Sequence, residues 1–317
     1  MPDTLSAATR KLVGRFRRQR PLRAGSLLIT LFGDAVAPHG GAISLGSLIR
    51  LTDPFGVGER LVRTSVARLA QDGWLASERE GRTSEYRLTD IGKRRFAEAT
   101  QRIYGSSPER WAGRWTLLLV PFNGTAREKV REELRWLGFG QVSQGLLAHP
   151  TRSVKEVRAQ LADLESPTEG ISIFEAHSGD LESDRRLAAS GWDLDELSRD
   201  YAAFVRSFAP VLDALRAPSA VESSKVDPPG VEAERAFVIR TLLVHEYRKI
   251  HLRDPLLPQD LLPANWIGNG AYELCRELYG QVFDAAERHF ASSASRTRGK
   301  LPALSRETWT RFGGLRR

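Results

Sequence analysis

Apolar residues spaced three and four positions apart predict a helix between Glu59 and Gln71. At 100° per residue, Val62, Val66 and Leu69 fall within one narrow arc that has to face a core. The opposite arc is polar and largely basic, and it consists of Arg60, Arg63, Thr64, Ala67, Arg68 and Gln71. The pattern therefore predicts a helix that is anchored on one side and presents cations to solvent on the other.

A short basic hairpin is predicted directly after this helix. Gly73 supplies a left-handed stop, residues 74–79 form a first strand, the chain turns at Glu80, Gly81 and Arg82, and residues 84–88 return. Upstream, residues 26–36 carry apolar positions at helical spacing, and Ser44 opens a second short helix. Three helices followed by a hairpin is the order of a winged helix-turn-helix domain, which presents its third helix to DNA.

The distribution of charge strengthens this interpretation. Residues 1–104 hold 18 basic and 10 acidic side chains, a net charge of +8, whereas residues 105–317 hold 29 of each. Within that second part, residues 105–290 are net −6 and the tail from Ala291 is net +6. Most charge runs are solvated helix faces. Here the whole positive excess of the chain lies within residues 1–104, the part that contains the helix and the hairpin, which favours a surface for duplex DNA.

The first 23 residues are a basic arm of net charge +6, with helical spacing at Leu5, Leu12 and Phe16. Two interpretations of the arm are open, a clamp on phosphates or a disordered segment. After the hairpin, Thr89 caps a helix that leads to a boundary at residues 105–108.

Residues 113–178 alternate between strand and helix patterns. Residues 115–121 are an apolar, β-rich run, and Thr125 with Glu128 forms a capping box for the helix that follows. Residues 139–149 read as two short strands, Ser153 and Glu156 form a second capping box, and residues 170–177 are a last strand. The order βαββαβ predicts a ferredoxin-like domain.

The remainder of the chain is predicted to be helical. Helices are expected over residues 194–215 behind a capping Asp193, over residues 232–250 and over residues 269–290, with a linker at residues 216–230. The predicted fold class is α+β with several domains. The expected domains are a basic arm (1–23), a winged helix-turn-helix with its linker helix (24–104), a ferredoxin-like domain (105–180), a helical C-terminal domain (181–290) and a basic flexible tail (291–317).

Composition narrows the class of protein. The chain is 41% hydrophobic and 27% charged, and it has no apolar run long enough for a transmembrane helix. Its N-terminus lacks the apolar stretch of a secretory signal, so we expect a cytoplasmic protein. The single cysteine, Cys275, lies in a helical pattern between Leu274 and Leu278 and is expected to be a small core residue.

No pattern in the sequence predicts an active site. Gly56-Val57-Gly58 lacks the third glycine and the preceding strand of a dinucleotide fingerprint. His245 and His251 are six residues apart, about 240° on a helix, so they cannot share a zinc ion as a pair four apart does, and we expect them to be hydrogen-bonded core residues. We therefore predict no catalytic residue, no metal site, no cofactor and no enzyme activity.

Several segments occur in a fixed order along the chain, and they include Arg63-Thr64-Ser65-Val66-Ala67-Arg68-Leu69, Gly81 to Thr89, Trp111-Ala112-Gly113-Arg114-Trp115, and His245-Glu246-Tyr247-Arg248 with Leu252-Arg253-Asp254-Pro255. Together they resemble the PaaX family of phenylacetic acid degradation repressors over about residues 22–290. The resemblance implies a winged helix domain, a ferredoxin-like domain akin to a small CRISPR-associated nuclease but non-catalytic, and a helical C-terminal domain. It also implies repression of aromatic-acid catabolic genes, relieved by an aryl-acetyl coenzyme A such as phenylacetyl-CoA. The basic tail lies outside the resemblance.

On this interpretation a homodimer reads a palindromic operator. The expected DNA contacts are Arg60, Arg63, Thr64, Arg68, Gln71, Arg82 and Arg87. A thioester needs an apolar pocket and cations, and the candidates are Trp115, Trp136, Tyr247, Arg248, Arg253 and Trp266. Taken singly, Trp115 and Trp266 are better explained as core aromatics and Arg253-Asp254 as a structural ion pair. Two alternatives are kept: a ligand-independent regulator or activator of the same architecture, and a metal-dependent nuclease that uses the ferredoxin-like domain.

Overall fold

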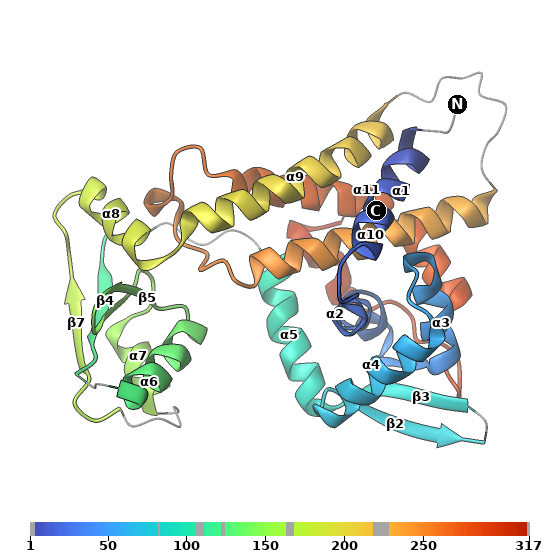
Figure 1. The fold of residues 1–317 in the computed structure, drawn as a ribbon, viewed down its shortest axis with the longest axis horizontal. Coiled ribbons are helices and arrows are strands. Elements are labelled where there is room, and N and C mark those ends of the chain that lie inside the picture. Colours follow the sequence, from blue (N-terminus) through green and yellow to red (C-terminus); the bar gives the residue numbers. More distant parts are fainter. Residues whose placement is uncertain are drawn as a thin grey trace. The chain divides into compact units, whose positions relative to one another are not determined.

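The chain folds into two compact units, each built from segments that are distant in sequence. The structure, a computed structural model, describes residues 4–81, 83–105, 111–121, 124–162, 168–217 and 228–315 (Figure 1). Unit 1 comprises residues 1–106, 202–252 and 269–317, and unit 2 comprises residues 107–201 and 253–268. None of the helices in these described ranges is both long and apolar enough to span a lipid bilayer.

The N-terminal part of unit 1 contains the helices and the hairpin that the sequence predicts. Its helices are α1 (Thr4–Arg17), α2 (Ala24–Leu31), α3 (Leu45–Thr52), α4 (Glu59–Gln71) and α5 (Asp90–Tyr104), joined by the short turns η1 (Phe32–Val36), η2 (Ala37–His39) and η3 (Asp53–Phe55). The hairpin strands β2 (Leu75–Glu80) and β3 (Thr83–Leu88) pair antiparallel, and β1 (Ala42–Ser44) pairs with the other edge of β3. The sequence analysis did not predict β1.

Local hydrogen bonds explain where these helices begin and end. The Ser44 hydroxyl caps α3 by accepting the Ser47 amide at 3.2 Å, and the Thr89 hydroxyl caps α5 by accepting the Gly92 amide at 2.9 Å. After α4, Gly73 adopts a φ of 74°, which a glycine reaches without steric cost. All three signals were readable in the sequence.

The helix α10 (Pro229–His251) forms the centre of unit 1. Every residue from 236 to 245 is buried, so the helix is enclosed on all sides. It packs against α1, α2 and α5, and the Phe16 ring of α1 lies edge-on to the His245 ring at 5.5 Å. The end of α9 (Leu194–Arg216) and most of α11 (Ile267–Ser293) complete the unit. Of the predicted linker, residues 218–227 lie outside the described residues.

The C-terminal tail differs from the expectation of a frayed segment. Residues 294–315 are described, they include η5 (Arg306–Gly313), and Thr308, Arg311 and Phe312 are buried. The Arg311 guanidinium donates to Asp34 Oδ1 at 3.0 Å, and the Phe312 ring lies edge-on to Tyr104. Composition alone gave no sign of this packing, because the partners named here, Asp34 and Tyr104, lie more than 200 residues earlier in the chain.

Unit 2 is built on a four-stranded antiparallel sheet with the order β5-β6-β4-β7. In chain order its elements are β4 (Trp115–Leu119), α6 (Gly124–Trp136), β5 (Gly140–Ser143), β6 (Leu146–His149), α7 (Val154–Ala162) and β7 (Ser172–Ala176). The predicted order βαββαβ is therefore confirmed. Leu118, Leu147, Val130 and Val157 form the centre of the core between the sheet and its two helices. The capping box at Ser153 and Glu156 is present, whereas the Thr125 side chain lies outside the described residues.

Two further helical elements complete unit 2. The helix α8 (Leu181–Gly191) packs against β5, and Asp193 caps α9 by accepting the Glu196 amide at 2.8 Å. Trp192, between α8 and α9, lies so close to β5 that a Cβ on Gly140 would be 2.5 Å from its ring. A side chain at position 140 would therefore displace the Trp192 ring. The turn η4 (Gln259–Leu261) returns to α8, where Arg185 donates to the Asp260 carbonyl at 2.8 Å.

Candidate nucleic-acid interface

The helix α4 separates a buried face from an exposed one as its periodicity predicts. Val62 and Val66 are fully buried and Leu69 is 6% exposed. The opposite face is exposed to solvent at each of its predicted positions, namely Arg60, Arg63, Thr64, Ala67, Arg68 and Gln71. A helix held by one apolar stripe can thus present six side chains to a groove without losing its anchorage.

The cations of this face are not equivalent. Arg63 is paired with Glu59 one turn earlier, at 2.6 Å, whereas Arg60 and Arg68 have no ion-pair partner among the residues that the structure describes. The Thr64 hydroxyl donates to the Arg60 carbonyl at 2.9 Å. The charges of Arg60 and Arg68 are therefore available to an anionic ligand, while Arg63 has to leave a carboxylate first.

The hairpin carries charges of both signs. Arg87 on β3 pairs with Glu78 on β2, and both side chains are about half exposed. Arg79 donates to the Gly81 carbonyl at 3.3 Å, which orders the approach to the turn. Arg82, the expected contact at the tip, lies outside the described residues. The hairpin residues that are described, 75–81 and 83–88, carry two arginines and three glutamates and so have no positive excess. The exposed face of α4 therefore supplies the local positive charge.

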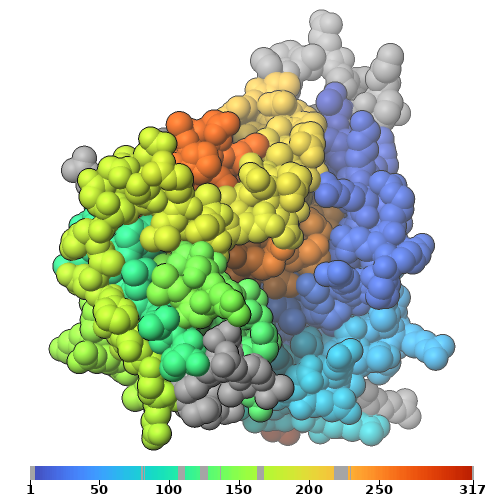
Figure 2. Space-filling view, turned by 60° about the vertical axis from the view of Figure 1, so that its left-hand side comes forward, coloured from blue at the N-terminus to red at the C-terminus, as the bar shows by residue number. Residues whose placement is uncertain are grey.

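The basic arm begins with a helix, α1, which packs against α10 and η3 of unit 1. Leu12 and Phe16 are 6% and 2% exposed, so the predicted apolar spacing is the side that packs. Arg17 donates to the Pro54 carbonyl at 3.1 Å, in the turn between α3 and α4. Figure 2 shows the surface of this helix in dark blue, and its exposed cations are Arg10, Lys11, Arg15 and Arg17. Of the two interpretations left open for the arm, disorder does not hold for the described residues 4–23.

Three of the candidate effector residues lie in unit 2 and already have structural partners. Trp115 is buried, and its Nε1 donates to Asp184 at 2.7 Å. Trp266 is 8% exposed and packs edge-on against Tyr201, with ring centroids 6.0 Å apart. Arg253 is exposed and pairs with Glu196 and Asp200. Asp254, which the sequence suggested as the partner of Arg253, accepts the Tyr201 hydroxyl at 2.7 Å.

Two other candidates lie on α10 in unit 1. Tyr247 is fully buried and stacks on His251, and the Arg248 guanidinium donates to the Thr30 hydroxyl at 2.8 Å and to the Ser26 carbonyl at 2.7 Å. Burial lowers the pKa of Arg248 to about 10. Arg248 thus holds α2 against α10. The side chain of the sixth candidate, Trp136, lies outside the described residues. The five candidates that are described are divided between the two units.

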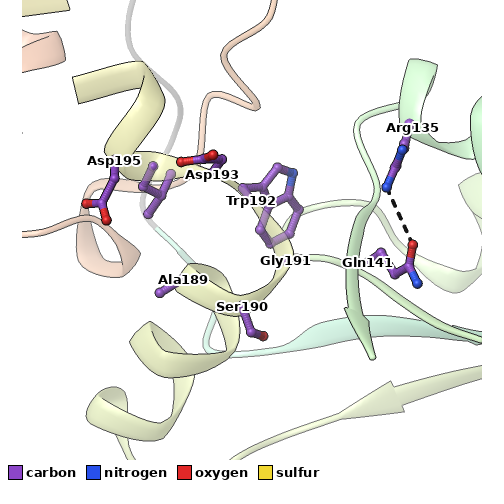
Figure 3. Close-up of a pocket in the computed structure, with 9 residues that line it drawn as sticks. Arg135, Gln141, Ala189, Ser190, Gly191, Trp192, Asp193 and Asp195 are labelled. Carbon is purple, nitrogen blue, oxygen red and sulfur yellow. Dashed lines mark hydrogen bonds between the residues drawn. The ribbon is translucent and has the colours of Figure 1, made fainter. Parts of the chain in front are cut away.

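One hollow in unit 2 lies where α8 meets α9 (Figure 3). It has a volume of about 440 Å³, and Trp192 stands between Asp193 on one side and the pair of Arg135 and Gln141 on the other. The Arg135 guanidinium donates to the Gln141 side chain at 3.5 Å. Its mixed charges fit no single ligand class, and none of the predicted effector residues lines it.

The histidines and the cysteine that might suggest chemistry are core residues. His245 is fully buried and shares a hydrogen bond with Thr30, and burial holds its pKa well below the usual range. His251 contacts the Tyr247 hydroxyl and the Arg102 carbonyl. Cys275 is fully buried. Within the described part of the chain no group of three His, Cys, Asp or Glu side chains is arranged to hold a metal ion.

Comparisons with known proteins match almost the whole chain. Residues 23–92 match the family model "PaaX-like protein", residues 108–188 match "PaaX protein central Cas2-like domain", and residues 192–292 match "PaaX-like protein C-terminal domain". A curated relative, "Transcriptional repressor PaaX" of Escherichia coli (strain K12), is 36% identical over 299 residues, covering 93% of this chain and 92% of the relative. Among solved structures, the uncharacterized protein Rv0674 from Mycobacterium tuberculosis is 22% identical with a TM-score of 0.48, over 78% of this chain and 89% of that chain.

Proposed function

The chain belongs to the PaaX family, and we propose that it is a cytoplasmic, DNA-binding transcriptional repressor of aromatic-acid catabolic genes. A relative with 36% identity over 93% of the chain is named a transcriptional repressor, which is a regulator and not an enzyme. One structural observation carries the proposal: α4 buries Val62, Val66 and Leu69 and exposes a cationic face. That is the disposition a recognition helix requires.

The DNA-reading domain in this proposal is a winged helix-turn-helix at residues 24–104. The helices α2 and η1, α3 and α4 supply its three helices, and the hairpin β2–β3 supplies the wing. In the same proposal residues 105–180, most of which match the Cas2-like family model over residues 108–188, act as a non-catalytic ferredoxin-like domain, and residues 181–290, most of which match the C-terminal family model over residues 192–292, act as the helical C-terminal domain. In the sequence, the basic arm (residues 1–23) precedes these domains and the basic tail (residues 291–317) follows them.

Each exposed side chain of α4 has an expected role. Arg60, Arg63 and Arg68 read guanine edges or bind phosphates, and Thr64 and Gln71 make shorter polar contacts in the major groove. Arg82 and Arg87 of the wing hold the adjacent backbone or minor groove. A homodimer places two such helices in successive major grooves of a palindrome, with half-sites about one helical turn or a multiple apart.

Release from the operator requires an effector that binds the DNA-competent and DNA-incompetent forms with different affinities. We propose an aryl-acetyl-CoA thioester such as phenylacetyl-CoA. Isothermal titration calorimetry with phenylacetyl-CoA and with free phenylacetate tests this directly. Tight binding of the thioester and weak binding of the acid support the proposal, and equal weak heats for both overturn the thioester.

The decisive experiment for the function is an electrophoretic shift of the region upstream of the protein's own gene. We expect a specific shift that survives random competitor DNA at physiological salt and is lost on adding an aryl-CoA thioester. A shift that no thioester alters would favour the ligand-independent regulator. Absence of any preferred fragment would overturn the repressor, and cleavage of labelled DNA with magnesium or manganese would favour the nuclease.

Arg68→Ala tests the recognition face at one position. Because Arg68 is exposed and has no ion-pair partner within the described ranges, its loss is expected to weaken operator binding by about 1–3 kcal/mol if it reads a base. Arg288→Ala, on the exposed side of α11, is the matched control and is expected to leave binding unchanged. Fluorescence anisotropy with operator and scrambled duplexes gives both affinities. Equal operator affinity for Arg68→Ala and the unaltered protein would move the recognition surface elsewhere.

A further inference from the structure

The helix α1 is buried on one side and carries cations on the other. The side that carries Phe16 packs into unit 1. The helical turn continues past the end of α1, because the Arg18 amide donates to the Gly14 carbonyl at 3.2 Å. At 100° per residue, three exposed cations then lie opposite the packed side, namely Arg10, Lys11 and Arg18. We call these three residues the cationic stripe, and Figure 2 shows the surface of α1 in dark blue.

No carboxylate of the arm itself balances the stripe. The described part of the arm, residues 4–23, contains seven basic side chains and no acidic one. Two of the other cations donate to neutral partners: Arg17 to the Pro54 carbonyl, and Arg15 to the Ser207 hydroxyl. None of the three stripe residues forms an ion pair with a residue that the structure describes. The charge of the stripe is therefore available to an anionic partner.

The elements beneath α1 do not balance the stripe either. The helix packs against α10 and η3. The 23 residues of α10 include four basic and three acidic side chains, and η3 adds the carboxylate of Asp53. Of the acidic side chains of α10, Glu246 already pairs with Lys249 at 3.0 Å. The seven positive charges of the arm thus remain in excess over those of its neighbours, which favours a polyanion as the partner.

The C-terminal end of α1 lies against the segment that leads into α4. The Arg17 guanidinium donates to the Pro54 carbonyl at 3.1 Å, and a Cβ on Gly56 would be 2.6 Å from Arg17 Nε. Two residues later, Gly58 is the N-cap of α4. The N-terminal residues of a recognition helix contact base edges in the major groove, so a DNA strand that borders the groove passes near this end. Arg18 of the stripe directly follows Arg17.

We propose that the cationic stripe of α1 binds the phosphate backbone of the duplex beside the groove that α4 reads. The inference rests on the proposed function and extends it to residues 10–18, which precede the family match that begins at residue 23. Arg10 and Arg18 are eight residues apart, about 12 Å along a helix, which is the length of between three and four base pairs of duplex. The stripe therefore spans several phosphates.

The test is the salt dependence of DNA binding by the full-length protein. The triple variant Arg10→Ala/Lys11→Ala/Arg18→Ala removes the stripe, and alanine keeps α1 helical. Each phosphate contact contributes about 0.9 to the slope of log K against log salt concentration, so the slope is expected to fall by about 2 to 3. Operator and scrambled duplexes should weaken by the same factor, because backbone contacts carry no base preference. Fluorescence anisotropy at several salt concentrations measures both quantities.

A second triple variant is the matched control for net charge. Lys129→Ala/Lys155→Ala/Arg158→Ala removes the same charge from three exposed positions of unit 2 and is expected to leave the slope unchanged. Thermal melting confirms that all three proteins are folded. An equal fall of the slope in both triple variants would reflect net charge alone and would overturn the inference, as would a loss of affinity for the operator only.

Flotation with vesicles of phosphatidylserine and phosphatidylcholine tests a lipid surface as the partner instead. Vesicle binding that the stripe variant loses, together with an unchanged slope for DNA, would assign the stripe to a membrane and overturn the inference.

The outcomes also separate this inference from the function on which it rests. If the stripe variant keeps the slope of the unaltered protein while both proteins still select the operator, the inference falls and the repressor stands. If the unaltered protein prefers no fragment but the stripe variant lowers the slope for random duplex, the repressor falls and the backbone contact of α1 stands.

Discussion

His149, at the end of β6, is held in one protonation state by two backbone amides. Its Nδ1 accepts the amide of Thr151 at 3.2 Å and that of Arg152 at 3.1 Å, so this nitrogen carries no proton. Burial, together with the charge of Arg152, lowers the pKa of His149 to about 3. A neutral histidine is therefore part of the folded form of unit 2.

We expect unit 2 to lose stability in mild acid because of this histidine. The folded pKa lies below the ordinary value of 6.5, so the unfolded chain takes up the proton first. As far as His149 determines it, the free energy of unfolding of unit 2 is highest above about pH 6.5. It then falls by about 1.4 kcal/mol per pH unit as the pH decreases toward 3. Urea unfolding between pH 7 and pH 5 measures the slope.

His149→Asn is the control for that measurement, because its Oδ1 can accept an amide and does not titrate. We expect the variant to unfold with a shallower pH dependence than the unaltered protein. The same slope in both proteins would show that other groups set the acid sensitivity. The buried state of His149 was not foreseen, since a histidine at the end of a strand gives no sequence signal of its burial.

At the scale of elements, the sequence predicted what local patterns determine. The helix α4, the hairpin, the caps at Ser44, Thr89 and Asp193, and the order βαββαβ all depend on residues close together in the chain. The strand β1 is three residues long, too short for a periodic pattern, and it exists because β3 offers it an edge. The packing of the C-terminal tail escaped prediction for a different reason, because its partners Ser44, Ser47 and Glu85 are distant in sequence.

The first turn of α4 carries a carboxylate, that of Glu59, whose negative charge repels the DNA that is proposed to bind this helix. Glu59 pairs with Arg63 at 2.6 Å, and both side chains are more than half exposed. An acidic residue in the first turn and a pair four residues apart each stabilise an isolated helix by a few tenths of a kcal/mol. This arrangement places a negative charge on the proposed DNA surface, and it engages Arg63 in an ion pair with Glu59.

Glu59→Gln is therefore expected to bind DNA more tightly while melting slightly lower. Freed Arg63 adds one phosphate or base contact, so the salt slope should steepen by up to about 0.9 and scrambled duplexes should gain affinity along with the operator. Anisotropy titrations at several salt concentrations measure both. Glu98→Gln, on α5, is the control for the change in net charge. Unchanged binding by Glu59→Gln would place the start of α4 outside the contact.

At the scale of the whole chain, a buried polar network joins segments from both ends of the sequence in unit 1. Asp34 of η1 is 3% exposed, and its Oδ1 accepts the hydroxyls of Tyr104 at 2.7 Å and Tyr279 at 2.9 Å. The same carboxylate pairs with Arg240 and with Arg311, each at 3.0 Å. Five elements, η1, α5, α10, α11 and η5, thus meet at one charge.

This network explains why the division into units departs from the linear order of the chain. The N-terminal helices share a core with α10, α11 and the tail, so residues 1–106 are in one unit with residues 269–317. Helical periodicity identified each of these helices singly. Their association depends on Asp34, Arg240 and Arg311. These three charged residues are buried, whereas the sequence alone leads one to expect charged residues at the surface.

Asp34→Asn is expected to destabilise unit 1 by about 3–5 kcal/mol, because it leaves the buried Arg311 guanidinium without a carboxylate partner among the described residues and Arg240 with Glu287 alone. Glu287 pairs with Arg240 but not with Arg311, so the tail should be released first. Urea unfolding measures the loss, and Asp53→Asn, an exposed carboxylate of η3, is the control. Arg311→Met removes the charge that Asp34→Asn leaves uncompensated. Its cost in free energy of unfolding should therefore be smaller in the Asp34→Asn background than in the unaltered protein. Additive losses would mean that the two residues act independently and that the tail is held by Phe312 and its ring contacts instead.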